Sequence, residues 1–148
     1  MEFQKPERST SFQFLAGNEM GFSEKVLKLR VLIVEDNASF REILKEKLQT
    51  VSFSMVIDEA TEGREVVEKV EVLKPEVVFM DIRLPGENGL QLTQKIKAKY
   101  PNTKVIFLTS YDSLEYRNAA IRSGGSCYIS KDSLHCIQIE KLLKSILE

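Results

Sequence analysis

The stretch VVFMDIRLPGENG, residues 77–89, decides how this chain folds, because an apolar run ends there in a carboxylate and a turn. Residues 77–80 are all apolar, which indicates a central strand that is covered on both faces of its sheet. The turn is predicted from Pro85, Gly86, Asn88 and Gly89. An aspartate is costly to bury unless a partner binds it, although aspartates also commonly cap turns. The stretch therefore leaves two interpretations of Asp81, a loop cap or part of a site.

Apolar runs and helical patterns alternate along the rest of the chain. Strands are predicted at residues 28–34, 53–58, 77–80, 104–110 and 126–130. Helices are predicted at residues 39–51, 66–73, 89–100, 113–123 and 133–147, with Asp112 or Ser113 as the cap of the fourth. Five strands and five helices joined by short connections predict a doubly wound α/β fold with a parallel five-stranded sheet.

The composition is that of an ordinary globular domain. The chain has 148 residues, of which 43% are hydrophobic and 29% charged, and its formal net charge is −1. This charge gives no electrostatic footprint for nucleic acid, and no apolar run approaches the roughly 18 residues of a membrane span. We therefore expect a cytoplasmic protein that binds neither membranes nor nucleic acid directly. Residues 1–24 fit no element and are expected to form a flexible tail or an added leader before a domain at 25–148.

The cysteines and the histidine do not predict a site of their own. Cys127 and Cys136 are the only cysteines, and His135 is the only histidine. Two cysteines without a CxxC spacing and one histidine form a poor metal set. We expect free thiols, because cytosolic chains rarely keep disulfides. No histidine-based catalytic triad can be assembled without His135, whose neighbours give no sign of one.

Polar residues follow four of the predicted strands directly. Glu35 and Asp36 follow the first strand, Asp81 the third, Thr109 the fourth and Lys131 the fifth. Each has an ordinary explanation alone, such as a helix cap or a solvated lysine. Ligands of open α/β sheets bind beyond the carboxyl ends of the strands, however, so these residues are expected to converge on one edge. The presence of such residues at four strand ends of the same sheet edge favours a functional site.

Such a set supports a narrow range of chemistry. Three neighbouring carboxylates raise one another's pKa unless a cation joins them. Oxygen ligands without cysteine or histidine suit a hard divalent ion, and Mg²⁺ in particular. A carboxylate can also attack phosphorus and hold the group as an acyl phosphate, while a lysine and a hydroxyl bind the remaining oxygens.

The segments VLIVEDN, VVFMDIRLPGENG, IFLTSYD and CYISKDS resemble the receiver domain of two-component response regulators, of the single-domain chemotaxis type. The resemblance covers about residues 28–147. It implies a flavodoxin-like sheet of order 2-1-3-4-5 and a signalling phosphoacceptor rather than an enzyme, with self-catalysed phosphotransfer and autodephosphorylation. It also implies Mg²⁺ as cofactor, a histidine kinase or phosphotransfer protein as donor, and an output protein or domain that the sequence does not name.

The resemblance assigns roles to individual residues. Asp81 would be the phosphoacceptor, and Thr109 and Lys131 would bind phosphoryl oxygens. The metal ligands would be Asp36 directly, Glu35 mainly through water, Asp81 and the backbone carbonyl of Arg83.

Further roles concern switching and the lifetime of the phosphoryl group. Tyr128 matches the switch aromatic that follows Thr109, although a strand aromatic also commonly fills a core. Arg83 and Tyr111 would flank the approach of the hydrolytic water and slow dephosphorylation. Asp132 follows Lys131 where many receivers have a proline, and a cis bond there would cost about 3–4 kcal/mol, so it is not assumed.

Three alternatives to a diffusible single-domain receiver remain. The chain could be the receiver part of a larger DNA-binding regulator, because SGGSCYISKDS resembles receivers attached to helix-turn-helix domains. A phosphatase of the haloacid dehalogenase type would need a second aspartate where Arg83 stands. A degenerate receiver used only for binding would lack phosphorylation residues, all of which are present here.

Overall fold

The computed structural model describes residues 28–110 and 113–148. The predicted tail at 1–24 and the predicted role of Tyr111 therefore lie outside the described residues. Five parallel strands form one sheet in the order β2-β1-β3-β4-β5, which confirms the predicted fold class. The strands are β1 (Leu29–Val34), β2 (Met55–Ala60), β3 (Val77–Asp81), β4 (Lys104–Thr109) and β5 (Cys127–Ser130).

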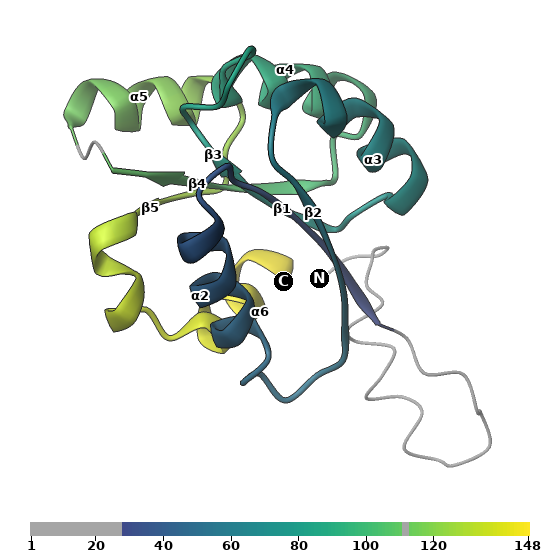
Figure 1. Cartoon of the computed structure of the whole chain (residues 1–148), viewed down its shortest axis with the longest axis vertical. Helices are drawn as coiled ribbons and strands as arrows, with labels where there is room; N and C mark the ends of the chain where they lie inside the picture. The colour runs from purple at the N-terminus through teal and green to yellow at the C-terminus, as the bar shows by residue number, and fades with distance from the viewer. Residues whose placement is uncertain (1–27, 111–112) are drawn as a thin grey trace.

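Helices cover both faces of the sheet (Figure 1). One face carries α2 (Ala38–Leu48) and α6 (Ile139–Leu147). The opposite face carries α3 (Val66–Leu73), α4 (Gly89–Lys99) and α5 (Leu114–Arg122). This three-layer arrangement is the one that a doubly wound fold requires, because each face of a buried parallel sheet needs an apolar cover.

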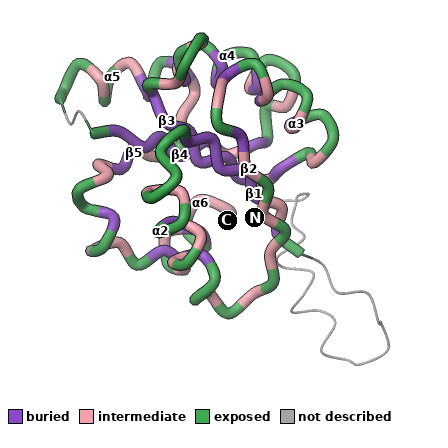
Figure 2. The backbone as a smooth tube through the Cα atoms, in the orientation of Figure 1, coloured by how far each residue is buried: buried purple, intermediate pink, exposed green. Residues whose placement is uncertain are grey.

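Two apolar cores lie on the two faces of the sheet, and the central strands β1, β3 and β4 between them are almost entirely buried (Figure 2). In β1, Val31 and Ile33 pack into the core of the α2–α6 face, whereas Leu32 and Val34 pack into the other core. This alternation follows from the two-residue period of a strand. Every residue of β3 is buried, which explains why the run at 77–80 has no polar position.

Side-chain caps fix the starts of several helices. Oδ1 of Asn37 accepts a hydrogen bond from the backbone N–H of Phe40 at 2.9 Å and caps α2. Oγ of Ser113 accepts one from Tyr116 at 3.2 Å and caps α5, as predicted, while the alternative cap Asp112 lies outside the described residues. Among the described residues, no helix combines the length and the apolar character that a membrane crossing requires.

The predicted position of the second strand was wrong by two residues. β2 runs from Met55 to Ala60 rather than from 53 to 58. Its register with β1 decides this, because Leu29 pairs with Met55 and Val34 pairs with Ala60. β2 lies at the edge of the sheet, so its apolar residues give only a weak signal for where the strand begins and ends. Its backbone pairing with β1 fixes these limits instead. As a consequence Glu59 belongs to the strand.

The single helix predicted at 133–147 was also wrong, because the structure divides this segment. A 3₁₀ turn covers Lys131–Cys136, and α6 begins only at Ile139. Ile137 between them is extended, with φ −82° and ψ 132°. The tighter turn places Leu134 in the same core as Ile139, and it is only 2% exposed there. Burial of Leu134 thus overrides the helical pattern of the sequence.

Candidate functional site

Three carboxylates lie together at the carboxyl edge of the sheet. Glu35 and Asp36 follow β1, and Asp81 ends the neighbouring strand β3. Carboxylate oxygens of the three residues lie within 4.8 Å of one another. Glu35 is wholly buried and Asp81 is 5% exposed, whereas Asp36 is exposed. The structure therefore brings the three predicted carboxylates together and leaves the cluster open to solvent at Asp36.

Lys131 brings a positive charge into this cluster from the end of β5. Its Nζ lies 2.8 Å from Oε1 of Glu35 and 3.3 Å from Oδ2 of Asp81. It also lies 5.0 Å from the centre of the Phe40 ring, which suits a partly buried cation. No cis peptide bond occurs within residues 28–110 and 113–148, so the bond to Asp132 is trans. Lys131 therefore reaches the carboxylates without a proline after it.

Burial dominates the ionisation of the inner carboxyl groups. It raises the pKa of Glu35 from 4.5 to about 7, with the charge of Asp81 adding to the rise and Lys131 opposing it. Burial also raises the pKa of Asp81, against the opposing effects of Lys131 and a backbone N–H. Burial by itself would lower the pKa of Lys131, but the two carboxylates together raise it. One ammonium thus offsets only part of the negative charge in the cluster.

The cluster fits a hard divalent cation. Oε1 of Glu35 is buried, and among the described residues it accepts no hydrogen bond and makes only an ion pair with Nζ of Lys131 at 2.8 Å. The other oxygen of Glu35 accepts from the backbone N–H of Asn37 at 3.0 Å. A set of carboxylate donors with an under-bonded buried oxygen and one exposed member matches the ligands that Mg²⁺ prefers.

The turn after β3 holds the Asp81 carboxylate in place. The backbone N–H of Arg83 donates to Oδ1 of Asp81 at 3.2 Å, and that of Gly89 donates to the carbonyl oxygen of Ile82 at 2.8 Å. A Cβ on Gly89 would lie 2.1 Å from the backbone oxygen of Asp81, so only glycine allows α4 to start this close. Asp81 therefore accepts one loop hydrogen bond and still presents its second oxygen to Lys131.

Thr109 and Tyr128 lie on the two strands beyond β3. Asp81 is in register with Leu108, so Thr109 stands one residue further along the same edge, where it is 2% exposed. Tyr128 lies on β5, half-buried against the core of the α3–α5 face. The guanidinium of Arg117 lies 5.4 Å from the centre of its ring. Thr109 thus stands at the site, and Tyr128 lies farther back along the sheet.

Two further contacts join predicted site residues to Tyr116 and Arg41, which the sequence patterns did not single out. Nη2 of Arg83 donates to the hydroxyl of Tyr116 on α5 at 3.3 Å. Nη1 of Arg41 on α2 donates to the backbone oxygen of Glu35 at 2.8 Å. Both contacts join segments whose relative position only the fold determines, so the sequence offered no periodic signal for either.

The comparisons with known proteins identify the family. The model of the response regulator receiver domain matches residues 31–146. Chemotaxis protein CheY of Thermotoga maritima is 39% identical over 102 residues, which cover 69% of this chain and 84% of that protein. Oxygen regulatory protein NreC of Staphylococcus carnosus is 36% identical over 106 residues, or 71% of this chain and 49% of that protein. The solved receiver domain of the putative response regulator NarL from Mycobacterium tuberculosis has a TM-score of 0.73 at 25% identity, covering 80% of this chain and 96% of that one.

The chain belongs to the response regulator receiver domain family, and its function class is that of a phosphoacceptor in two-component signalling. It spans about half the length of the first curated relatives it matches, two of which are named transcriptional regulatory proteins. CheY, in contrast, is matched over 84% of its length.

Proposed function

We propose that Asp81 is the residue that accepts the phosphoryl group. The observation that carries this proposal is the position of its carboxylate, which ends a fully buried central strand and lies 3.3 Å from a lysine and beside two further carboxylates. Glu35 is fully buried and already bonded to a backbone N–H, and Asp36 is too exposed for a protected acyl phosphate. Asp81 combines partial access with a fixed orientation.

The chain's own residues support in-line transfer. A carboxylate oxygen of Asp81 attacks the phosphorus of a phosphohistidine, the phosphorus–nitrogen bond breaks, and the donor imidazole keeps the electron pair. The ammonium of Lys131 gives up one of its carboxylate partners and pairs with a phosphoryl oxygen instead. The hydroxyl of Thr109 donates a hydrogen bond to a second phosphoryl oxygen. The transfer and the later hydrolysis are self-catalysed, so the protein acts as a signalling phosphoacceptor rather than as an enzyme with a separate substrate.

Mg²⁺ is the cofactor that the donor set supports. Asp36 and Asp81 would bind the ion directly, Glu35 mainly through water, and the backbone carbonyl of Arg83 would complete the protein ligands. When bound, the ion supplies positive charge that offsets the negative charge of the carboxylates and of the incoming phosphoryl group.

The signal leaves the site through Thr109 and Tyr128. Movement of Thr109 toward a phosphoryl oxygen opens space behind it, and the half-buried ring of Tyr128 follows. The affected face is built by α5, β5 and α6, and phosphorylation biases it between two arrangements. The phosphoryl group in turn is shielded by Arg83 and Tyr111, which slows hydrolysis.

The partners are a histidine kinase or phosphotransfer protein as donor and an output protein or domain, in a cytoplasmic setting. A receiver at 25–148 within a larger DNA-binding regulator is the second candidate, because the match covers only 44–49% of each of the first relatives, and two of them are named transcriptional regulatory proteins.

Incubation with acetyl phosphate and Mg²⁺, followed by intact mass spectrometry, tests the proposal. One phosphoryl adduct is expected in the parent, and none in Asp81→Asn or when Mg²⁺ is chelated. An adduct of equal yield in Asp81→Asn would overturn the assignment, provided that circular dichroism shows the variant to be folded.

A further inference from the structure

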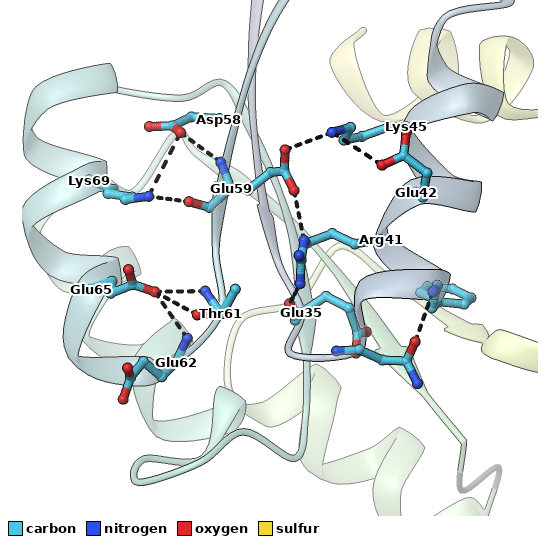
Figure 3. A network of polar contacts seen from close by, with 12 residues as sticks. Glu35, Arg41, Glu42, Lys45, Asp58, Glu59, Thr61, Glu62, Glu65 and Lys69 are labelled. Atoms are coloured by element: carbon cyan, nitrogen blue, oxygen red, sulfur yellow. Dashed lines mark hydrogen bonds and ion pairs between the residues drawn. The ribbon is translucent and has the colours of Figure 1, made fainter.

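Arg41 connects the segment that carries Glu35 and Asp36 to the edge of the sheet (Figure 3). Its Nη1 donates to the backbone oxygen of Glu35 at 2.8 Å, and its Nε donates to Oε1 of Glu59 at 2.7 Å. The side chain of Arg41 is only 18% exposed and that of Glu59 is 33% exposed, so both hydrogen bonds are partly protected from water. One guanidinium thus bridges α2, the end of β2 and the loop that follows β1.

The backbone oxygen of Glu35 belongs to the peptide group that joins Glu35 to Asp36. The backbone N–H of Glu35 donates to Ala60 at 3.0 Å, which fixes the other side of this residue. With both its N–H and its carbonyl bonded, the backbone of Glu35 has one orientation. Because a peptide group is planar, the direction of its carbonyl also sets where the chain continues into Asp36.

Glu59 is held firmly enough to serve as the anchor of Arg41. Nζ of Lys45 lies 2.8 Å from its second oxygen, so one carboxylate is shared by two cations (Figure 3). The bond from Lys45, together with that from Arg41, keeps the pKa of Glu59 below its ordinary value, and Glu59 stays ionised at neutral pH. Within residues 28–110 and 113–148, Lys45 contacts Glu59 and Glu42 and makes no hydrogen bond to the loop after β1.

We propose that Arg41 is a positioning residue for the metal site, which sets the affinity for Mg²⁺ by fixing the carbonyl of Glu35 without binding the ion itself. This inference rests on the Mg²⁺ site proposed above. A planar guanidinium can donate to two acceptors in a fixed geometry, whereas an ammonium on a flexible stem acts as a point charge. Partners that orient metal ligands commonly change metal affinity by about 10–100-fold when they are removed.

Arg41→Gln and Lys45→Gln form a matched pair for the test. Each removes one cation from Glu59, but only the first removes the hydrogen bond to Glu35. The chain has no tryptophan, so Mg²⁺ binding is measured by isothermal titration calorimetry, and thermal unfolding is measured with EDTA. A merely structural role for Arg41 would lower Tm in both variants and leave Mg²⁺ affinity in both alike.

The expected result is a Kd for Mg²⁺ about tenfold higher in Arg41→Gln and within about twofold of the parent in Lys45→Gln. Arg41→Lys keeps the positive charge but loses the planar guanidinium that donates to two acceptors. Its Kd for Mg²⁺ should therefore lie between those of Arg41→Gln and Lys45→Gln. This variant also replaces Arg41→Gln in the test if the glutamine variant does not fold. Phosphoryl uptake by Arg41→Gln should recover when Mg²⁺ is saturating.

Equal Kd values in Arg41→Gln and the parent, or equal increases in Arg41→Gln and Lys45→Gln, would overturn the inference alone. A parent protein that binds no Mg²⁺ would overturn the proposed metal site as well, so the two failures are distinguishable.

Discussion

We expect the buried carboxyl group of Glu35 to make the stability of the metal-free protein depend on pH, and Glu35→Gln should remove the part of this dependence that Glu35 causes. Burial raises the pKa of Glu35 from 4.5 to about 7 in the folded protein. A carboxyl group with a raised pKa stabilises the fold fully below pH 4.5 and loses this contribution as the pH rises through about 7. The glutamine cannot ionise, so the stability of Glu35→Gln should fall less than that of the parent in this window, with only the smaller contribution of Asp81 left in the site.

The size of the effect follows from the shift. A rise from 4.5 to about 7, at about 1.4 kcal/mol for each pH unit, corresponds to about 3 kcal/mol. Glu35 is wholly buried, so water screens this effect little. Between pH 5 and pH 8 the free energy of unfolding of the parent should therefore fall by about 2–3 kcal/mol relative to that of Glu35→Gln.

Urea unfolding in EDTA at several pH values measures this difference. Glu140→Gln is the control, because its hydrogen bonds with Ser52 lower the pKa of Glu140 and its pH effect has the opposite sign. With saturating Mg²⁺, the free energy of unfolding of the parent should change less with pH, because the positive charge of the ion offsets the negative charge of the ionised carboxylate. Parallel profiles for the parent and Glu35→Gln in EDTA would refute the reasoning.

Three further predictions concern the turn, the core and the phosphoryl lifetime. Gly89→Ala would place a Cβ 2.1 Å from the Asp81 carbonyl, so urea unfolding should show a loss of about 3 kcal/mol, and an unchanged stability would contradict this contact. Thr93→Val replaces a buried hydroxyl that has no hydrogen-bond partner among the described residues, so stability should rise by about 1 kcal/mol, and a clear loss in the same assay would show that the hydroxyl is satisfied. Arg83→Asn with Tyr111→Glu should speed autodephosphorylation about tenfold, and an equal or longer half-life in Mg²⁺ would rule out shielding.

The strand-end residues could be predicted because their placement depends on local patterns and one topological rule. Apolar runs mark the central strands, and the carboxyl ends of parallel strands always share an edge of the sheet. From these two facts the proximity of Asp81 and Lys131 can be predicted without any knowledge of side-chain geometry. The roles of these residues, in contrast, came from a resemblance to the family and stay predictions.

Other features could not be predicted because they depend on how distant segments pack. The position of β2 is set by its register with β1, and the division at Ile137 by the burial of Leu134. The bond between Arg41 and Glu59 joins residues 18 positions apart, and it exists only because β2 extends to Ala60. No pattern of hydrophobicity carries this information.

The chemical identity of the phosphorylated residue tests the central claim most directly. The protein is phosphorylated with acetyl phosphate and Mg²⁺ and then treated with borohydride, which reduces an aspartyl phosphate to homoserine, and tandem mass spectrometry locates the product. We predict homoserine at position 81 alone, and only when Mg²⁺ is present. Reduction at position 36 or at another carboxylate, with Asp81 unmodified, would contradict the account.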